Sequence, residues 1–245
     1  MSFVVLFIAS LWAGVQNALA GGGSFLTLPS LILTGMDARA ANITSCVALF
    51  PAQLATGWTA KKHVSGPPGL PFRALAGISL VGGAIGAGLL LVTPASFFAR
   101  LVPWLVFFAT GLFAWQWFGP RRHSAARLKR TAAAGAQFAI SIYGGYFGGG
   151  IGFLMLAALS AAGLALRTAW ATKNVLAAAM NASAVAILVF SPEIRWFAAL
   201  VSAAGAILGG ILGGMMGHKV PERTLGLLVV LIGTALTIGL FLRST

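Results

Sequence analysis

The sequence predicts an all-α protein, a polytopic transmembrane helical bundle made of two inverted-topology repeats of about five segments each. Hydrophobic residues make up 59% of the 245 residues and charged residues only 8%, whereas soluble domains carry roughly 25% charged residues. Several apolar runs exceed the roughly 18 residues that mark a membrane span. An internal similarity between the two halves of the chain predicts the repeats.

Ten hydrophobic segments follow one another along the chain. The first five cover about 2–20, 24–35, 38–60, 70–93 and 97–118, and the second five about 131–148, 152–165, 168–190, 194–217 and 222–242. The first run lacks a basic n-region and a convincing cleavage site, so we interpret it as a span and not as a signal peptide. The segments that begin at Ser24 and Gly152 are too short for an ordinary span, which predicts one half-helix, re-entrant segment or strongly tilted helix in each half.

The two halves are related by a shift of 128 residues. Identical residues then meet at Gly21 and Gly149, Gly22 and Gly150, Phe25 and Phe153, Leu26 and Leu154, Arg39 and Arg167, and Thr44 and Thr172. The similar amides Gln53 and Asn181 also coincide. We therefore expect a first transmembrane repeat in residues 1–118, a basic cytoplasmic linker in 119–130 and a second repeat in 131–245.

The positive charges predict how the halves are oriented. The linker carries Arg121, Arg122, Arg127, Lys129 and Arg130, and a first-half loop carries Lys61, Lys62 and Arg73. Basic loops stay in the cytoplasm. The second-half loop that matches Lys61–Arg73 holds only Glu193 and Arg195, whereas the next one holds Lys219 and Arg223. This exchange of charge between the halves is typical of an inverted repeat, with both termini outside.

Two glycine breaks interrupt the apolar runs, the first break at residues 21–24 and the second break at residues 149–152. A helix that begins inside such a break leaves its first N–H groups unpaired and adds partial positive charge there. An anion or water would satisfy these donors in a membrane. The breaks therefore predict a binding site, and the alternative is that their glycines serve only close helix packing. For the GxxxG pairs Gly82/Gly86 and Gly209/Gly213, packing is the favoured interpretation.

Acidic residues are nearly absent, and this predicts the sign of the ligand. Asp37, Glu193 and Glu222 all fall at segment ends or in loops. No catalytic set and no metal-ligand spacing is present, so we expect neither an enzyme, nor a bound metal, nor a cofactor. An interior with few acidic groups and many hydrogen-bond donors suits an anion better than a cation. The net charge of +13 is assigned to loops and lipid head groups and not to nucleic-acid binding.

Polar residues in and near the breaks complete the set of candidates. The candidate substrate-binding residues are Gln16, Asn17, Gly22, Gly23, Ser24, Thr44, Ser45, Gln53, Gly149, Gly150, Gly152, Thr172, Lys173, Asn174 and Asn181. Lys173 either extends to an interface or supplies charge to an anion. Gln53 and Asn181 either face the cavity or bond another helix. Arg39 and Arg167 are interpreted as interfacial anchors.

These motifs resemble a known family. Residues 21–26 with Pro29, Gly35 and Thr44-Ser45 resemble the first signature of the sulfite exporter TauE/SafE family, and residues 148–153 through 172–174 resemble its second signature. The resemblance covers nearly the whole chain. It implies a bacterial membrane permease that moves sulfur-containing anions such as sulfite or organosulfonates. Ala157 stands where a proline is expected by analogy with Pro29.

The sequence thus predicts a secondary transporter, a multi-pass protein of the bacterial plasma (inner) membrane. It would move a small sulfur-containing anion by alternating access and hold it at the midplane between the two half-helix N-termini. A channel-like anion pore and a membrane scaffold or assembly subunit are the alternatives. The exact substrate, the direction, the coupling ion and the oligomeric state, a homo-oligomer included, stay open.

Overall fold

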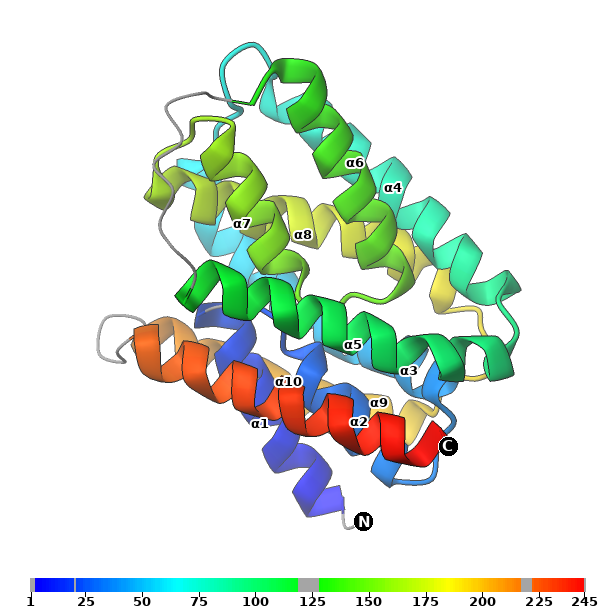
Figure 1. Ribbon diagram of the computed structural model, residues 1–245. Coiled ribbons are helices and arrows are strands. Elements are labelled where there is room, and N and C mark those ends of the chain that lie inside the picture. The colour runs from blue at the N-terminus through cyan, green and yellow to red at the C-terminus, as the bar shows by residue number, and fades with distance from the viewer. Residues whose placement is uncertain (1–2, 20, 119–127, 217–221, 245) are drawn as a thin grey trace.

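The computed structural model describes residues 3–19, 21–118, 128–216 and 222–244, and within them the chain forms ten α-helices and one 3-10 turn (Figure 1). The helices are α1 (Phe3–Leu19), α2 (Ser24–Leu33), α3 (Ala38–Ala60), α4 (Phe72–Val92), α5 (Ala95–Phe118), α6 (Arg130–Tyr146), α7 (Ile151–Ala161), α8 (Leu166–Leu188), α9 (Trp196–Met216) and α10 (Glu222–Ser244), with the turn η1 (Lys61–His63) after α3. The predicted all-α fold is confirmed. Each predicted hydrophobic segment is a helix.

Three of the described helices are long and apolar enough to cross a membrane, Phe72–Val92, Leu166–Leu188 and Trp196–Gly213. The two helices that follow the breaks are much shorter, with 10 residues in α2 and 11 in α7. The prediction of one short helix in each half is therefore confirmed. The predicted linker 119–130 lies mostly outside the described residues, and so does Lys219.

Helix α3 begins separately from α2 because Asp37 caps it. The carboxylate of Asp37 accepts hydrogen bonds from the backbone N–H groups of Arg39 and Ala40, each at 3.0 Å. An aspartate in this position stabilises a helix start and ends the preceding turn. Helix α8 begins after Ala165 with no side-chain cap, so the two halves differ at this point.

The packing of the helices is exchanged between the halves. Helix α1 packs most extensively on α9, and α6 packs most extensively on α4. Under the repeat, α6 is the equivalent of α1 and α4 is the equivalent of α9. Equivalent helices also pack on each other, as α3 does on α8 and α5 on α10, and Figure 1 shows α5 and α10 side by side. The halves are therefore interleaved and do not form two separate bundles.

Glycines make the close approach of the exchanged helices possible. A Cβ built on Gly86 of α4 would stand 2.7 Å from the backbone nitrogen of Tyr146 in α6. A Cβ built on Gly213 of α9 would stand 2.9 Å from both Cα and the carbonyl oxygen of Val15 in α1. Both distances are shorter than real Cβ contacts. The packing interpretation of the two GxxxG pairs is thus confirmed, since small residues let helix backbones meet in membranes.

The contact between α3 and α8 includes a hydrogen bond between equivalent residues. Asn181 Nδ2 donates to Gln53 Oε1 at 2.6 Å, across a sequence separation of 128 residues. That separation equals the repeat shift. The two amides thus bring equivalent positions of the two halves into direct contact.

We expect Gly86→Ala to lower the free energy of unfolding by about 1–3 kcal/mol, because an added methyl group overpacks the contact with α6. Thermal unfolding of the purified protein in detergent checks this through Tm. Gly88→Ala, in the same helix, is the control because a Cβ there meets nothing within 4 Å. Equal shifts in the two variants would contradict the packing role of Gly86.

A double-mutant cycle of Gln53→Ala and Asn181→Ala is expected to give a coupling energy of about 0.5–1.5 kcal/mol, the range found for hydrogen bonds between membrane helices. Unfolding of each variant in detergent measures it. Pairing Asn181→Ala with Ser30→Ala serves as control, because the Ser30 hydroxyl bonds Leu26 within its own helix. A coupling no larger than that of the control pair would show that the two amides act independently.

Candidate functional site

The two glycine breaks lie against each other. A Cβ built on Gly21 would be 3.3 Å from Cα of Gly152, and one built on Gly148 would be 3.8 Å from Ser24 Oγ. The starts of α2 and α7, which come from different halves of the chain, are therefore neighbours in space. This proximity is what a site formed jointly by the two breaks requires.

Several positions in the breaks can be occupied only by glycine. Gly22 has φ +83° and Gly150 has φ +75°, both in the left-handed region, which glycine adopts at no steric cost. A Cβ on Gly23 would also stand 2.6 Å from the carbonyl oxygen of Ala13 in α1. Conformation and close helix contact thus both require glycine here.

Each break has one carbonyl group that is satisfied by a side chain from the preceding helix. Gln16 Nε2 in α1 donates to the Gly22 oxygen at 3.2 Å, and the Tyr143 hydroxyl in α6 donates to the Gly149 oxygen at 2.9 Å. Both donors precede their acceptors by six residues. Gln16 is among the residues predicted from the sequence, whereas Tyr143 is not, although the common spacing of six residues could have indicated it.

The N–H groups of the breaks are left open. Neither α2 nor α7 has a side-chain cap on its first turn; their N-cap residues are Gly23 and Gly150. Within the described part of the chain, the N–H groups of residues 22–24 and 149–152 have no hydrogen-bond acceptor. Two sets of backbone donors, each at the positive end of a helix, therefore lie next to each other.

Two adjacent residues of helix α3 lie close to the two breaks. The hydroxyl oxygens of Ser45 and Thr27 are 2.5 Å apart, and Thr27 belongs to the first turn of α2. Cys46 Sγ is 3.8 Å from the Cβ that would stand at Gly148. Ser45 is thus one of the candidates that the structure places beside a break.

Lys173 and Asn174 of α8 are the repeat equivalents of Ser45 and Cys46. Lys173 is 3% exposed and Asn174 is 6% exposed. The Lys173 ammonium lies 5.8 Å from the centre of the Trp170 ring, and it has no hydrogen bond or ion pair with another described residue. Asn174 Nδ2 is buried without a partner among the described residues. Both side chains therefore hold unused hydrogen-bond donors inside the protein.

Thr44 and Thr172 use their hydroxyl groups on loops of the opposite half. Thr44 Oγ1 accepts from the backbone N–H of Arg195 at 3.3 Å. Thr172 Oγ1 accepts from the N–H of Ser65 at 3.1 Å and donates to its carbonyl oxygen at 2.9 Å. These contacts attach the α8–α9 loop to α3 and the α3–α4 loop to α8.

Among the remaining candidates, Asn17 is half-buried beside the first break. Its Cβ atom is 3.2 Å from the position that a Cβ atom on Gly23 would take.

Arg39 links the two halves at one end of the molecule. Its Nη2 pairs with Glu193 in the α8–α9 loop, its Nε donates to Glu193 Oε2 at 3.1 Å, and its Nη1 donates to the Thr93 carbonyl at 2.5 Å. The equivalent Arg167 is exposed and forms no ion pair among the described residues. The sequence predicted the same anchoring role for both arginines, but only Arg39 joins three segments.

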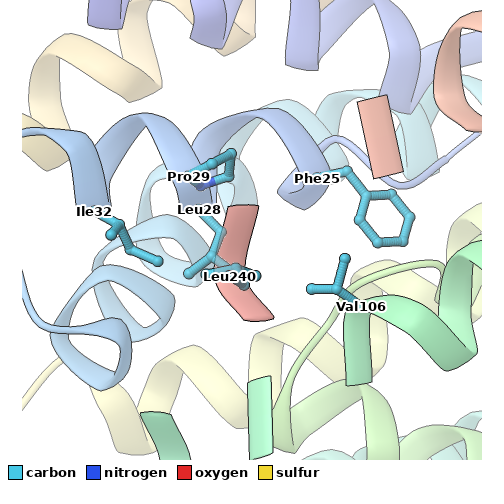
Figure 2. Close-up of a pocket in the computed structure, with 6 residues that line it drawn as sticks. All are labelled: Phe25, Leu28, Pro29, Ile32, Val106 and Leu240. Atoms are coloured by element: carbon cyan, nitrogen blue, oxygen red, sulfur yellow. The ribbon is translucent and has the colours of Figure 1, made fainter. Parts of the chain in front are cut away.

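An apolar pocket lies beside the first break, and it is unsuited to an anion. Its lining consists of Phe25, Leu28, Pro29 and Ile32 of α2, Val106 of α5 and Leu240 of α10. Figure 2 shows Phe25 and Val106 pointing toward each other within it. No polar side chain lines it. The breaks, with their backbone donors, are thus the polar feature of this region, and the described residues contain no cluster of three metal-ligating side chains.

Comparison with known proteins assigns the chain to a family. The family described as sulfite exporter TauE/SafE matches residues 6–240. A probable membrane transporter protein of Haemophilus influenzae is 28% identical over 210 residues, covering 83% of this chain and 80% of the relative. A probable membrane transporter protein, ORF9, of a Sinorhizobium species is 26% identical over 249 residues, covering 98% of this chain and 92% of the relative. No solved structure matches the chain. The protein is a membrane transporter that belongs to the sulfite exporter TauE/SafE family.

Proposed function

We propose that the protein is a secondary transporter of a small sulfur-containing oxyanion, sulfite or an organosulfonate, in the bacterial plasma membrane. The observation that supports this most is the contact between two glycine-led helix starts whose N–H groups have no described acceptor. An anion placed between them accepts hydrogen bonds and meets the positive ends of two helix dipoles. The family match supports the sulfur-containing class.

The chemistry of the head group fits the donors around the breaks. A sulfite or sulfonate group presents three oxygen atoms in a small volume, and its ionised oxygens accept hydrogen bonds. The backbone N–H groups of residues 22–24 and 149–152 bind these oxygens. We assign the opposite charge to Lys173 and a further donor to Asn174 Nδ2, because both are buried on α8 next to Leu176, which shares a buried cluster with Ile151 of the second break. Gln16, which holds the first break in shape, and Ser45, which bonds Thr27, act as positioning residues.

Transport in this proposal uses alternating access about a two-fold axis, which we assign to the contact between Gln53 and Asn181. Two inverted repeats that exchange conformations would open the site first to one side and then to the other. Arg39 and Glu193 join the halves at one end, whereas Arg167 is unpaired among the described residues at the equivalent position. We infer that the Arg39–Glu193 ion pair holds its end of the pathway closed and separates when that end opens.

Flux in proteoliposomes tests the proposed function. We expect saturable uptake of radiolabelled sulfite or of a labelled alkanesulfonate, and about a tenfold loss of flux in Gly150→Ala. A left-handed backbone costs an L-residue about 1–2 kcal/mol, which displaces the α7 start. Gly135→Ala in α6 is the control, because Gly135 is exposed and a Cβ there meets nothing within 4 Å.

Three outcomes of this experiment separate the candidate functions. Saturable, slow flux supports the carrier. Single-channel currents in planar bilayers would replace it with an anion pore. A protein that is folded by its unfolding transition but moves neither sulfite nor sulfonate would refute the proposal and favour a scaffold role.

Alkylation of Cys46 tests the closing role of the ion pair. Cys46 is the chain's single cysteine, is buried and lies beside the second break, so its reaction with a water-soluble maleimide reports opening. In Glu193→Gln we expect several-fold faster labelling, because a neutral amide no longer balances the half-buried Arg39 and the opened state is favoured. Arg167→Gln, at the equivalent exposed position, should label at the wild-type rate.

Unfolding curves show whether Glu193→Gln is folded at the labelling temperature, so that faster alkylation reports opening and not denaturation. Equal labelling of wild type and folded Glu193→Gln would contradict the closing role. Equal acceleration by Arg167→Gln would also contradict it, because the two ends would then respond alike.

A further inference from the structure

We propose that the site selects singly charged anions and discriminates against doubly charged ones, because it contains one buried positive charge without a counter-ion. This inference rests on the proposed function and adds a rule for the substrate: its net charge is −1. The rule separates oxyanions of nearly the same size and shape, such as methanesulfonate and sulfate.

Lys173 provides this charge. Its side chain is 3% exposed, its ammonium lies near the Trp170 ring at 5.8 Å, and no described carboxylate pairs with it. Burying an unpaired ammonium is costly because the charge loses its hydration without gaining an opposite charge. Lys173 stands on α8 between Ala169 and Leu176, which share a buried cluster with Ile151 at the start of α7. An anion held at the breaks would offset the cost of the buried charge, so that the lysine and its ligand stabilise each other.

The other described charges are already balanced or lie in solvent. Glu193 pairs with Arg39, and Asp37 is exposed and caps α3. Apart from Arg39 and Lys173, every lysine and arginine whose side chain the structure describes is exposed. Among the described residues, Lys173 is therefore the one buried cation that a bound anion would neutralise.

The first half does not supply a second charge. At the position equivalent to Lys173 stands Ser45, whose hydroxyl is already bonded to Thr27 at 2.5 Å. The neighbouring pair, Cys46 and Asn174, is neutral in its ordinary state. The site thus combines two sets of backbone donors, one from each half, with a single full charge from the second half alone.

The net charge of the occupied site then decides whether a monoanion or a dianion binds more tightly. A monoanion beside Lys173 leaves the buried site neutral. A dianion leaves one negative charge that only backbone and amide dipoles compensate, at a cost that grows as water is excluded. Sulfonates stay singly charged at all physiological pH values and sulfate stays doubly charged, whereas sulfite exchanges between the two forms near neutral pH. Sulfonate and hydrogensulfite are therefore the expected substrates.

Binding of methanesulfonate and sulfate to the purified protein tests the rule, measured by calorimetry or by the ligand-dependent rise in Tm. The two ions differ chiefly at one position on sulfur, where methanesulfonate carries a methyl group and sulfate carries a charged oxygen. We expect at least tenfold tighter binding of methanesulfonate at equal ionic strength. Lys173→Met should lose at least tenfold in methanesulfonate affinity, while Lys173→Arg keeps most of it. Lys62→Met is the matched control, because it makes the same change at an exposed lysine and should leave both affinities unchanged.

Each result decides one of the two claims. Equal affinities for methanesulfonate and sulfate, with transport of either, would overturn the charge rule and leave the transporter intact. Retained methanesulfonate affinity in a folded Lys173→Met would overturn the role of the lysine. Absence of binding and flux for sulfite, methanesulfonate and sulfate in the folded wild type would instead refute the proposed function.

Discussion

The constraint on which this structure depends is that backbone polar groups within a membrane have no water to bind. Helices satisfy them internally, but the two breaks interrupt helices. The protein meets the requirement for the carbonyl groups of Gly22 and Gly149 through Gln16 and Tyr143. For the N–H groups it supplies no described acceptor. A break of this kind is stable when an acceptor from outside the chain, a ligand or water, completes its hydrogen bonds.

The interleaved packing brings the two breaks together. Each break follows directly after α1 or α6, and each of these helices packs on the fourth helix of the opposite half. The glycines of α4 and α9 allow those pairs to approach until backbones touch. As a result the ends of α1 and α6 bring Gly21 next to Gly152. Loose packing of either pair would separate the breaks.

Much of this architecture could be predicted from the sequence, because it follows from local hydrophobicity and from the repeat. The helices, the two short segments and the packing glycines all appear where the apolar runs and GxxxG spacings indicate. The different fates of Arg39 and Arg167 could not be predicted, since they depend on whether an acidic loop from the other half lies nearby. The use of Thr44 and Thr172 on loop backbones depends in the same way on distant partners. The roles of the candidate site residues in binding stay predictions.

The contact between Gln53 and Asn181 bears on how such a chain can evolve. In an assembly of two identical copies, a residue on the symmetry axis touches its own twin, so every substitution there occurs on both sides at once. Joining the copies in one polypeptide removes that coupling. A glutamine can then face an asparagine, and a lysine can occupy one half while a serine remains in the other. A difference in charge between equivalent positions is thus a property that only the fused chain can acquire.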